Sequence, residues 1–411
     1  MSKLLERFLK YVSIETTSDP NSNSHPSSIK ELDLINALEI ELQELGLMNI
    51  YKSKEGYLYA MLPKNSDEEY YTIGLIAHVD TSSDMSGKDI NVQIIKDYNG
   101  NDVTLNECLQ IKMTTEEFPF LKSLKGRTLL TTDGTTLLGA DDKAGIAEII
   151  TMIEHLNKHP EIKHGDIYIA FTPDEEIGEG TLFFELDKFP CDFAYTVDGG
   201  QEGEINYENF NAASALVKIK GINIHPGSAK DHMVNSTLIA MEFNTLLDPN
   251  MIPAKTELYE GFNHLNSING SVENTTMHYI IRNHSKELFE KQKNDFLDIE
   301  KKLNEKYPSQ PVKVKIVDSY YNMYDIIKDH MNIVDIAIEA TKKANVEVSI
   351  SPIRGGTDGA TLTYKGLNTP NLGTGGYNFH GKYECITLEG MEKVVEILLN
   401  IVANVKKESV K

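Results

Sequence analysis

Continuous apolar runs and helical repeats alternate along the N-terminal half of the chain. Residues 71–79, 167–171 and 193–197 are short, mostly apolar and rich in β-branched and aromatic residues, which is typical of strands buried on both faces. Residues 4–12 and 145–156 instead carry apolar side chains at helical spacing. Strands that alternate with helices predict an α/β fold with a mostly parallel sheet flanked by helices.

The pattern changes after about residue 210, where some strands alternate apolar and polar residues as half-solvated strands do. The predicted segments are, in chain order, strand 213–220, helix 236–247, strand 272–282, helix 285–307 and strand 312–317. This β-α-β-α-β order predicts a smaller α+β domain inserted into the larger one. We therefore expect a discontinuous larger domain over 1–209 and 320–411 and an inserted domain over 210–319.

Local signals fix a few element boundaries. Ser28 followed by Glu31 is a capping box, which predicts an amphipathic helix from that point to near Gly46. Residues 390–405 predict a final amphipathic helix. Residues 81–127 form a long acidic segment that follows neither period, so they predict no particular element.

Composition excludes several classes of protein. With 411 residues, two domains are expected, and the net charge of −22 disfavours a nucleic-acid partner because phosphate binding requires a basic surface. No window is apolar enough for a membrane helix, and charges near the N-terminus argue against a signal peptide. Three scattered cysteines without metal-ligand spacing favour a reduced, cytoplasmic protein.

Two adjacent carboxylates, Asp141 and Asp142, lie where the extended run 128–138 gives way to the helix over 145–156. An aspartate there is a good helix cap, and the helix dipole favours an anion. Adjacent carboxylates also repel each other, and a bound cation relieves that repulsion. The stretch alone leaves the helix cap and the cation site open.

Other acidic and histidine residues follow strands or lie in loops. They are His78 and Asp80 after the first buried strand, Glu175 and Glu176 after the second, Asp198 after the third and His380 in a glycine-rich loop. Each taken singly is an ordinary surface residue. Together they predict a metal site, because the carboxyl ends of parallel strands meet at one edge of a sheet. Two histidines with several carboxylates suit zinc or similar ions and a two-metal hydrolase.

These stretches resemble the motifs of the M20 family of metallopeptidases. The matching stretches are AHVDTS from Ala77, GADDKAG from Gly139, TPDEEIG from Thr172, VDGG from Val197, IHPGSAK from Ile224, IRGGTDGA from Ile353 and NFHGKYE from Asn378. They occur in the family's order over most of the chain. The resemblance implies a di-zinc exopeptidase-like fold, with the inserted domain serving as lid and dimerisation domain.

The resemblance also implies residue roles. His78 and Asp198 would bind one metal ion, Glu176 and His380 a second, and Asp141 both. Asp80 would orient the His78 ring, and Glu175 would act as general base toward a metal-activated water. Zinc is the expected ion, with cobalt or manganese as alternatives. The Asp141–Asp142 peptide bond is expected to be cis.

The predicted reaction is release of the N-terminal residue from short peptides, tripeptides above all. We expect Arg282 or Arg354 to hold the substrate carboxylate, although each could instead make a structural ion pair. A homodimer through the inserted domain, with His225 reaching the partner's active site, is also expected. The alternatives are another M20-type activity (carboxypeptidase, dipeptidase or deacylase of N-acyl amino acids) and a non-catalytic peptide-binding protein.

Overall fold

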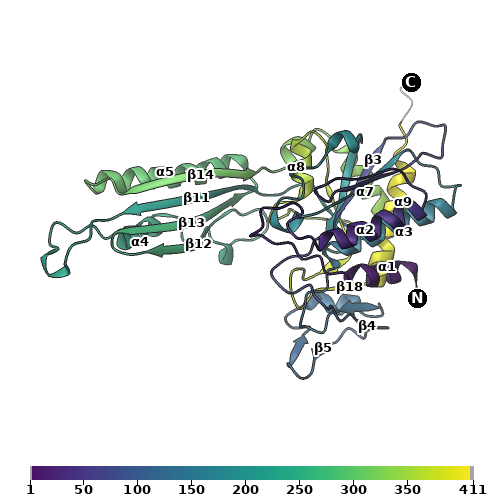
Figure 1. Ribbon diagram of the computed structural model, residues 1–411, viewed down its shortest axis with the longest axis horizontal. Coiled ribbons are helices and arrows are strands. Elements are labelled where there is room, and N and C mark those ends of the chain that lie inside the picture. The colour runs from purple at the N-terminus through teal and green to yellow at the C-terminus, as the bar shows by residue number, and fades with distance from the viewer. Residues whose placement is uncertain (1, 408–411) are drawn as a thin grey trace. The chain divides into compact units, whose positions relative to one another are not determined.

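The computed structural model describes residues 2–407 and divides into two compact units (Figure 1). The second unit comprises Glu208–Asp325 together with Pro352–Gly356, and the rest of the described chain forms the first unit. The expected insertion over 210–319 therefore lies inside the second unit, which also takes in the short segment around Arg354. Within residues 2–407, no helix has the length and apolar content needed to cross a membrane.

The first unit is built on an eight-stranded sheet. Its order is β1 (Met48–Lys52), β2 (Leu58–Leu62), β8 (Ile167–Thr172), β3 (Ile73–His78), β9 (Phe193–Gly199), β16 (Asn371–Gly373), β10 (Glu204–Asn206) and β15 (Ser349–Ile350). The four consecutive strands β8, β3, β9 and β16 run parallel, whereas β1, β2 and β10 pair antiparallel with β2, β8 and β16. The predicted α/β fold with a mostly parallel sheet is confirmed.

Helices pack against this sheet, and α3 (Ala140–Lys158) is central among them because it contacts β3 and β9 directly. Its side chains are buried almost all round, which explains why its apolar repeat is continuous. The other helices of this unit are α1 (Lys3–Val12), α2 (Glu31–Glu44), α7 (Asn332–Lys343), α8 (Asp358–Tyr364) and α9 (Leu388–Asn404). Helices α1 and α9 pack on α3, and α8 packs on β9.

Helix α2 begins at Glu31 itself, so the expected capping box is only half formed. The Glu31 carboxylate accepts a hydrogen bond from the Ser28 N–H at 3.1 Å. In the other direction, the Glu31 N–H donates to the backbone oxygen of Ser28. The second Glu31 oxygen accepts instead from the N–H of Asp174, in the turn after β8.

The segment that showed no sequence pattern forms very short strands. They are β4 (Gln93–Ile95), β5 (Val103–Asn106) and β6 (Ile111–Met113), and the first of them joins a four-stranded sheet with β7 (Leu129–Thr131), β18 (Cys385–Thr387) and β17 (Gly376–Tyr377). Strands of two to four residues are too short to display a period of two. A small core of their own that includes Val103, Met113 and Leu129 stabilises them.

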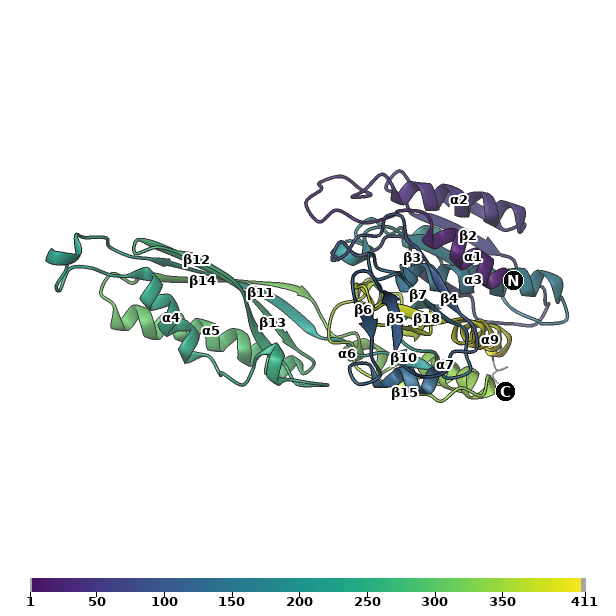
Figure 2. The same cartoon turned by 90° about the horizontal axis from the view of Figure 1, so that it is seen from below.

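The second unit is an α+β sandwich of one antiparallel sheet and two helices (Figure 2). Its elements are β11 (Asn211–Lys220), α4 (Ser236–Leu246), β12 (Phe262–Gly270), β13 (Asn274–Asn283), α5 (Lys286–Lys306) and β14 (Val312–Tyr320). The order is β-α-β-β-α-β, so the predicted β-α-β-α-β order was wrong by one strand. The missed strand, β12, lies at the sheet edge and is rich in exposed Asn and Ser, so it lacks the apolar alternation of a half-buried strand.

Candidate metal centre

The predicted metal ligands of the first unit meet at the carboxyl edge of its parallel strands. His78 is the last residue of β3, and Asp198 lies at the end of the adjacent strand β9. Glu175 and Glu176 begin the 3-10 turn that follows β8, the other neighbour of β3. Parallel neighbours end at the same edge, which is why ligands distant in sequence converge here.

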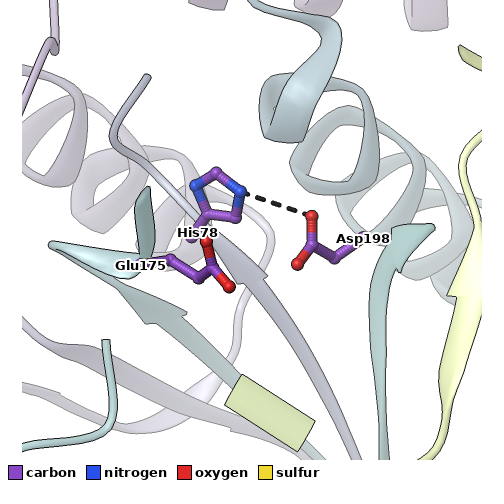
Figure 3. Close-up of side chains that lie close together, drawn as sticks. All are labelled: His78, Glu175 and Asp198. Atoms are coloured by element: carbon purple, nitrogen blue, oxygen red, sulfur yellow. Dashed lines mark ion pairs between the residues drawn. The ribbon is translucent and has the colours of Figure 1, made fainter. Parts of the chain in front are cut away.

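One group of side chains surrounds His78, which is buried. Its Nε2 atom lies 2.9 Å from Asp141 Oδ1 and 3.3 Å from Asp198 Oδ1. Figure 3 shows this ring facing Asp198, with the Glu175 carboxylate close to both side chains. The ligand atoms of His78, Glu175 and Asp198 all lie within 4.8 Å of one another.

A second group surrounds His380, which the loop between β17 and β18 carries. Its Nε2 atom lies 2.9 Å from Glu176 Oε2 and 3.0 Å from Asp141 Oδ2. Asp141 thus presents one carboxylate oxygen to each histidine. The second Glu176 oxygen, Oε1, is buried and has no hydrogen-bond partner within the described chain.

This donor set fits divalent metal ions. Each histidine Nε2 faces two carboxylate oxygens, but it carries at most one proton and can donate to only one of them. A cation between these atoms can bind all of them, and histidine with carboxylate is a common zinc ligand set. The ligand atoms of His78, Asp141 and Glu176 also lie within 4.8 Å of one another, so Asp141 links the two groups.

Burial and close contact shift the pKa values of the groups in this centre. Burial raises the pKa of Asp198 to about 6 and that of Glu176 to about 7. Hydrogen bonds to Asp141 and Glu176 raise the pKa of His380 to about 11. Buried carboxylates so close together are costly without a positive charge among them, which again fits a cation.

Asp80 is fully buried and joins the two parts of the centre. Its carboxylate oxygens accept from the N–H groups of Glu175 at 3.0 Å and Glu176 at 3.1 Å. The Nδ1 atom of His78 lies 3.0 Å from the Asp80 backbone oxygen and 3.3 Å from its Oδ1. Asp80 therefore contacts the His78 ring, as its predicted role requires, and also fixes the turn that carries both glutamates.

The start of α3 places Asp141. Gly139 has φ = 77°, the left-handed conformation that glycine adopts most readily, and the Asp141–Asp142 peptide bond is cis, as the resemblance implied. Asp142 does not join the metal-binding groups. Its buried carboxylate accepts from the His78 N–H at 3.2 Å and from the Gly145 N–H at 3.2 Å.

Sequence reasoning missed Glu384, which is 1% exposed and ends the stretch NFHGKYE. Its carboxylate accepts from the N–H groups of Leu138, Gly139 and Asp141 at 2.6, 2.9 and 3.1 Å. Burial raises its pKa to about 7, although these donors favour the ionised form. The only sequence signal was its position four residues after His380.

The predicted substrate-binding residues belong to the second unit. His225 is exposed, and its Nδ1 accepts from the Gly227 N–H at 3.2 Å. Arg282 donates to the backbone oxygens of Ala213 at 3.2 Å and Ile281 at 2.9 Å. Among the described residues the arginines that form salt bridges are Arg7 and Arg127, so neither Arg282 nor Arg354 makes the structural ion pair considered from the sequence.

Arg354 donates to four acceptors in the segment 256–260. They are the backbone oxygens of Leu258 at 2.6 Å, Glu260 at 2.9 Å and Thr256 at 3.3 Å, and the Thr256 hydroxyl at 3.1 Å. Its guanidinium also lies 5.0 Å from the centre of the Phe210 ring. In this arrangement the Arg354 guanidinium donates its hydrogen bonds mainly to backbone oxygens. Its role toward a substrate carboxylate therefore stays a prediction.

The fold and the centre define an α/β protein whose histidine and carboxylate ligands are of the kind found in metal-dependent hydrolases. The chain belongs to peptidase family M20/M25/M40, whose sequence model matches residues 131–404. A protein named Peptidase T from Caldanaerobacter subterraneus subsp. tengcongensis is 55% identical over 98% of each chain, and one from Halothermothrix orenii is 52% identical over the same share. The crystal structure of aminopeptidase PepT from Bacillus cereus ATCC 10987 has the same fold, with a TM-score of 0.77 and 22% identity over 98% of each chain.

Proposed function

We propose that this protein is a metallo-aminopeptidase that releases the N-terminal residue of tripeptides. The observation that carries the proposal is the pair of histidine–carboxylate groups that share Asp141 at the carboxyl edge of the sheet. Relatives named Peptidase T, at 50–55% identity over 98% of this chain, support the same reading.

The proposed roles follow the contacts. His78 with Asp198, and His380 with Glu176, would each hold one divalent ion, and Asp141 would contact both. Zinc is the expected ion, with cobalt or manganese as alternatives, and the ions would polarise the scissile carbonyl and lower the pKa of the attacking water. Asp80 would keep the His78 ring in place. Glu175 would take the proton of the water and return it to the leaving amine.

The test of the base is Glu175→Gln, with Glu179→Gln as a matched control. Glu179 lies in the same loop, but its side chain is 44% exposed. We expect the Glu175 variant to lose at least a hundredfold in kcat, since general-base catalysis is typically worth that much, while metal content stays near the wild-type value. A metal content that falls together with activity would make Glu175 a ligand, which its place beside His78 and Asp198 allows.

The end of the peptide from which a residue is released is tested with one tripeptide in free, N-acetylated and C-amidated forms. We expect the free peptide to give an amino acid from the N-terminus and a dipeptide. Acetylation should abolish cleavage because it removes the ammonium, whereas amidation should mainly raise KM because it removes the carboxylate that an arginine would hold. Release of the C-terminal residue would instead identify a carboxypeptidase.

We also propose a homodimer in which His225 acts in the partner's active site. His225 lies on an exposed His-Pro-Gly turn, a suitable projecting tip. Mixing Glu175→Gln chains with His225→Ala chains should restore activity, because the mixed dimer contains one site with both wild-type groups. If activity does not return although subunit exchange is proven, His225 does not act in the partner's site. A cytoplasmic location, favoured by three free cysteines, remains a prediction.

A further inference from the structure

Glu384 is a buried acid that the proposed reaction does not use. It lies at the end of the loop that carries His380 and immediately before β18. Both of its carboxylate oxygens are engaged: Oε2 accepts from the N–H groups of Leu138 and Gly139, and Oε1 accepts from the N–H of Asp141.

These three N–H groups form a small anion-binding concavity. They belong to the turn that leads into α3, where Gly139 adopts the left-handed conformation and turns its N–H toward the same point as its neighbours. The regular turns of α3 begin only after Asp142, because Asp141 and Asp142 have non-helical φ and ψ angles. An internal carboxylate, supplied from a distant part of the chain, therefore occupies a site that suits an anion.

The same loop contacts Asp141 twice. His380 Nε2 lies 3.0 Å from the Asp141 carboxylate, and Glu384 accepts from the Asp141 N–H at 3.1 Å. The side chain of Asp141 can face two histidines only if its backbone is held in one orientation. Glu384 provides a hydrogen bond to the Asp141 backbone that is separate from the contacts of the Asp141 carboxylate with the two histidines.

We propose that Glu384 is a positioning residue that aims Asp141 between the two metal-binding groups, an inference that rests on the proposed function. A carboxylate is required because both oxygens accept hydrogen bonds. Glutamine has nearly the same shape, but its NH₂ group would face at least one of the three N–H donors and leave that donor unpaired.

The test compares Glu384→Gln with Glu154→Gln. Glu154 is also a buried acid and belongs to α3 itself, near the C-terminal end of that helix, and it pairs with Lys3 and Arg7 rather than with the centre. Its loss lowers stability without touching the metal-binding groups. Binding of Co²⁺ is measured by calorimetry at pH 8, together with the cobalt absorption spectrum, kcat and KM.

We expect Glu384→Gln to weaken Co²⁺ binding by about 10–100-fold, the usual effect of removing a group that orients a ligand, and to change the cobalt spectrum. Its kcat should fall while KM stays within about twofold, because the change alters the centre and leaves the substrate-binding groups in place. The Glu154 variant should keep wild-type affinity and spectrum. Unchanged Co²⁺ binding in Glu384→Gln, or an equal loss in Glu154→Gln, would overturn the inference.

A second measurement decides the matter if Glu384→Gln does not fold. In the metal-free wild-type protein, the amide hydrogens of Leu138, Gly139 and Asp141 should exchange slowly because a buried carboxylate binds them. Exchange as fast as in an open turn would refute the inference. If the wild-type protein binds no Co²⁺ at all, the proposed function fails, and amide exchange alone tests the role of Glu384.

Discussion

Replacing Gly145 with alanine has two opposite effects on stability at the point where α3 crosses β9. Helix propensity favours alanine, whereas packing against the strand disfavours it. In the interior of a helix, alanine is favoured over glycine by about 1 kcal/mol. A Cβ atom at position 145, however, would lie 2.0 Å from the backbone oxygen of Val197 and 2.5 Å from Asp142 Oδ1. Contacts of a Cβ atom below 3.0 Å essentially never occur, so the helix and the strand must separate by about 1 Å.

The packing effect is the larger of the two. Overpacking costs about 1–3 kcal/mol, and a clash with strand backbone belongs at the upper end of that range because backbone cannot rotate away. After the gain in helix propensity is subtracted, we expect a loss of about 2 kcal/mol in stability. The separation also moves Asp198, the residue after Val197, away from Asp141, so metal affinity should fall as well.

The assay is urea unfolding of the metal-free protein together with calorimetric titration of Co²⁺. Gly355→Ala is the matched control, because the nearest atom to its added Cβ, Ile353 Cγ2, would be 4.0 Å away. That variant should unfold at the wild-type midpoint or slightly above it. If Gly145→Ala is as stable as the wild type and binds Co²⁺ equally well, the argument that this glycine sets the spacing of the ligands is wrong.

Three further predictions concern Glu154, Arg354 and the removal of metal ions. Hydrogen bonds from Lys158, Lys3 and Arg7 outweigh burial and lower the pKa of Glu154 from 4.5 to about 2, so its stabilisation is fully present above pH 5 and is lost as the pH falls toward 2. Glu154→Gln should therefore lower the free energy of unfolding, measured with urea, by about 1–2 kcal/mol at pH 7 and by almost nothing near pH 2. The value at pH 7 is discounted because the lysine partners are exposed. A loss of stability that does not depend on pH would contradict this. Arg354→Lys should speed amide exchange in 256–260, because lysine cannot reproduce four guanidinium hydrogen bonds, and unchanged exchange would refute that role. A chelator should abolish peptidase activity and lower the melting temperature, since ions that bind only the folded state at about a thousand times their Kd stabilise it by about 4 kcal/mol; a melting curve that does not respond would contradict metal binding at this centre.

Sequence patterns were sufficient where an element is long or fully buried. Strands β3, β8 and β9 were predicted because each is a continuous apolar run, and their parallel order then brought His78, Glu175 and Asp198 to one edge. These three residues could be placed together before the structure because they follow strand ends, where the fold itself determines position. The roles of Asp141 and His380, which lie at a helix start and in a loop, came from the family resemblance.

The features that were missed depend on contacts that no local pattern records. Strand β16 has three residues and helix α8 has seven, too few to display a period. Glu384 lies about 240 residues along the chain from the N–H groups that it binds, so nothing near it in the sequence indicates its partners. Arg354 appeared suited to a carboxylate because its charge is visible in the sequence, whereas the backbone oxygens that it contacts are not.

The position of β16 in the central sheet has a consequence for the newly synthesised chain. This strand pairs with β9 and β10, both of which leave the ribosome long before it. About 170 residues separate the end of β9 from the start of β16, so at 5–20 residues per second β9 has an open hydrogen-bonding edge for about 9–34 s. During that interval the nascent chain presents an apolar strand edge to other chains, which is the condition that favours aggregation and chaperone binding. The centre of the sheet is thus completed almost last, and misassembly during translation is a risk that follows from the strand order rather than from the stability of the finished fold.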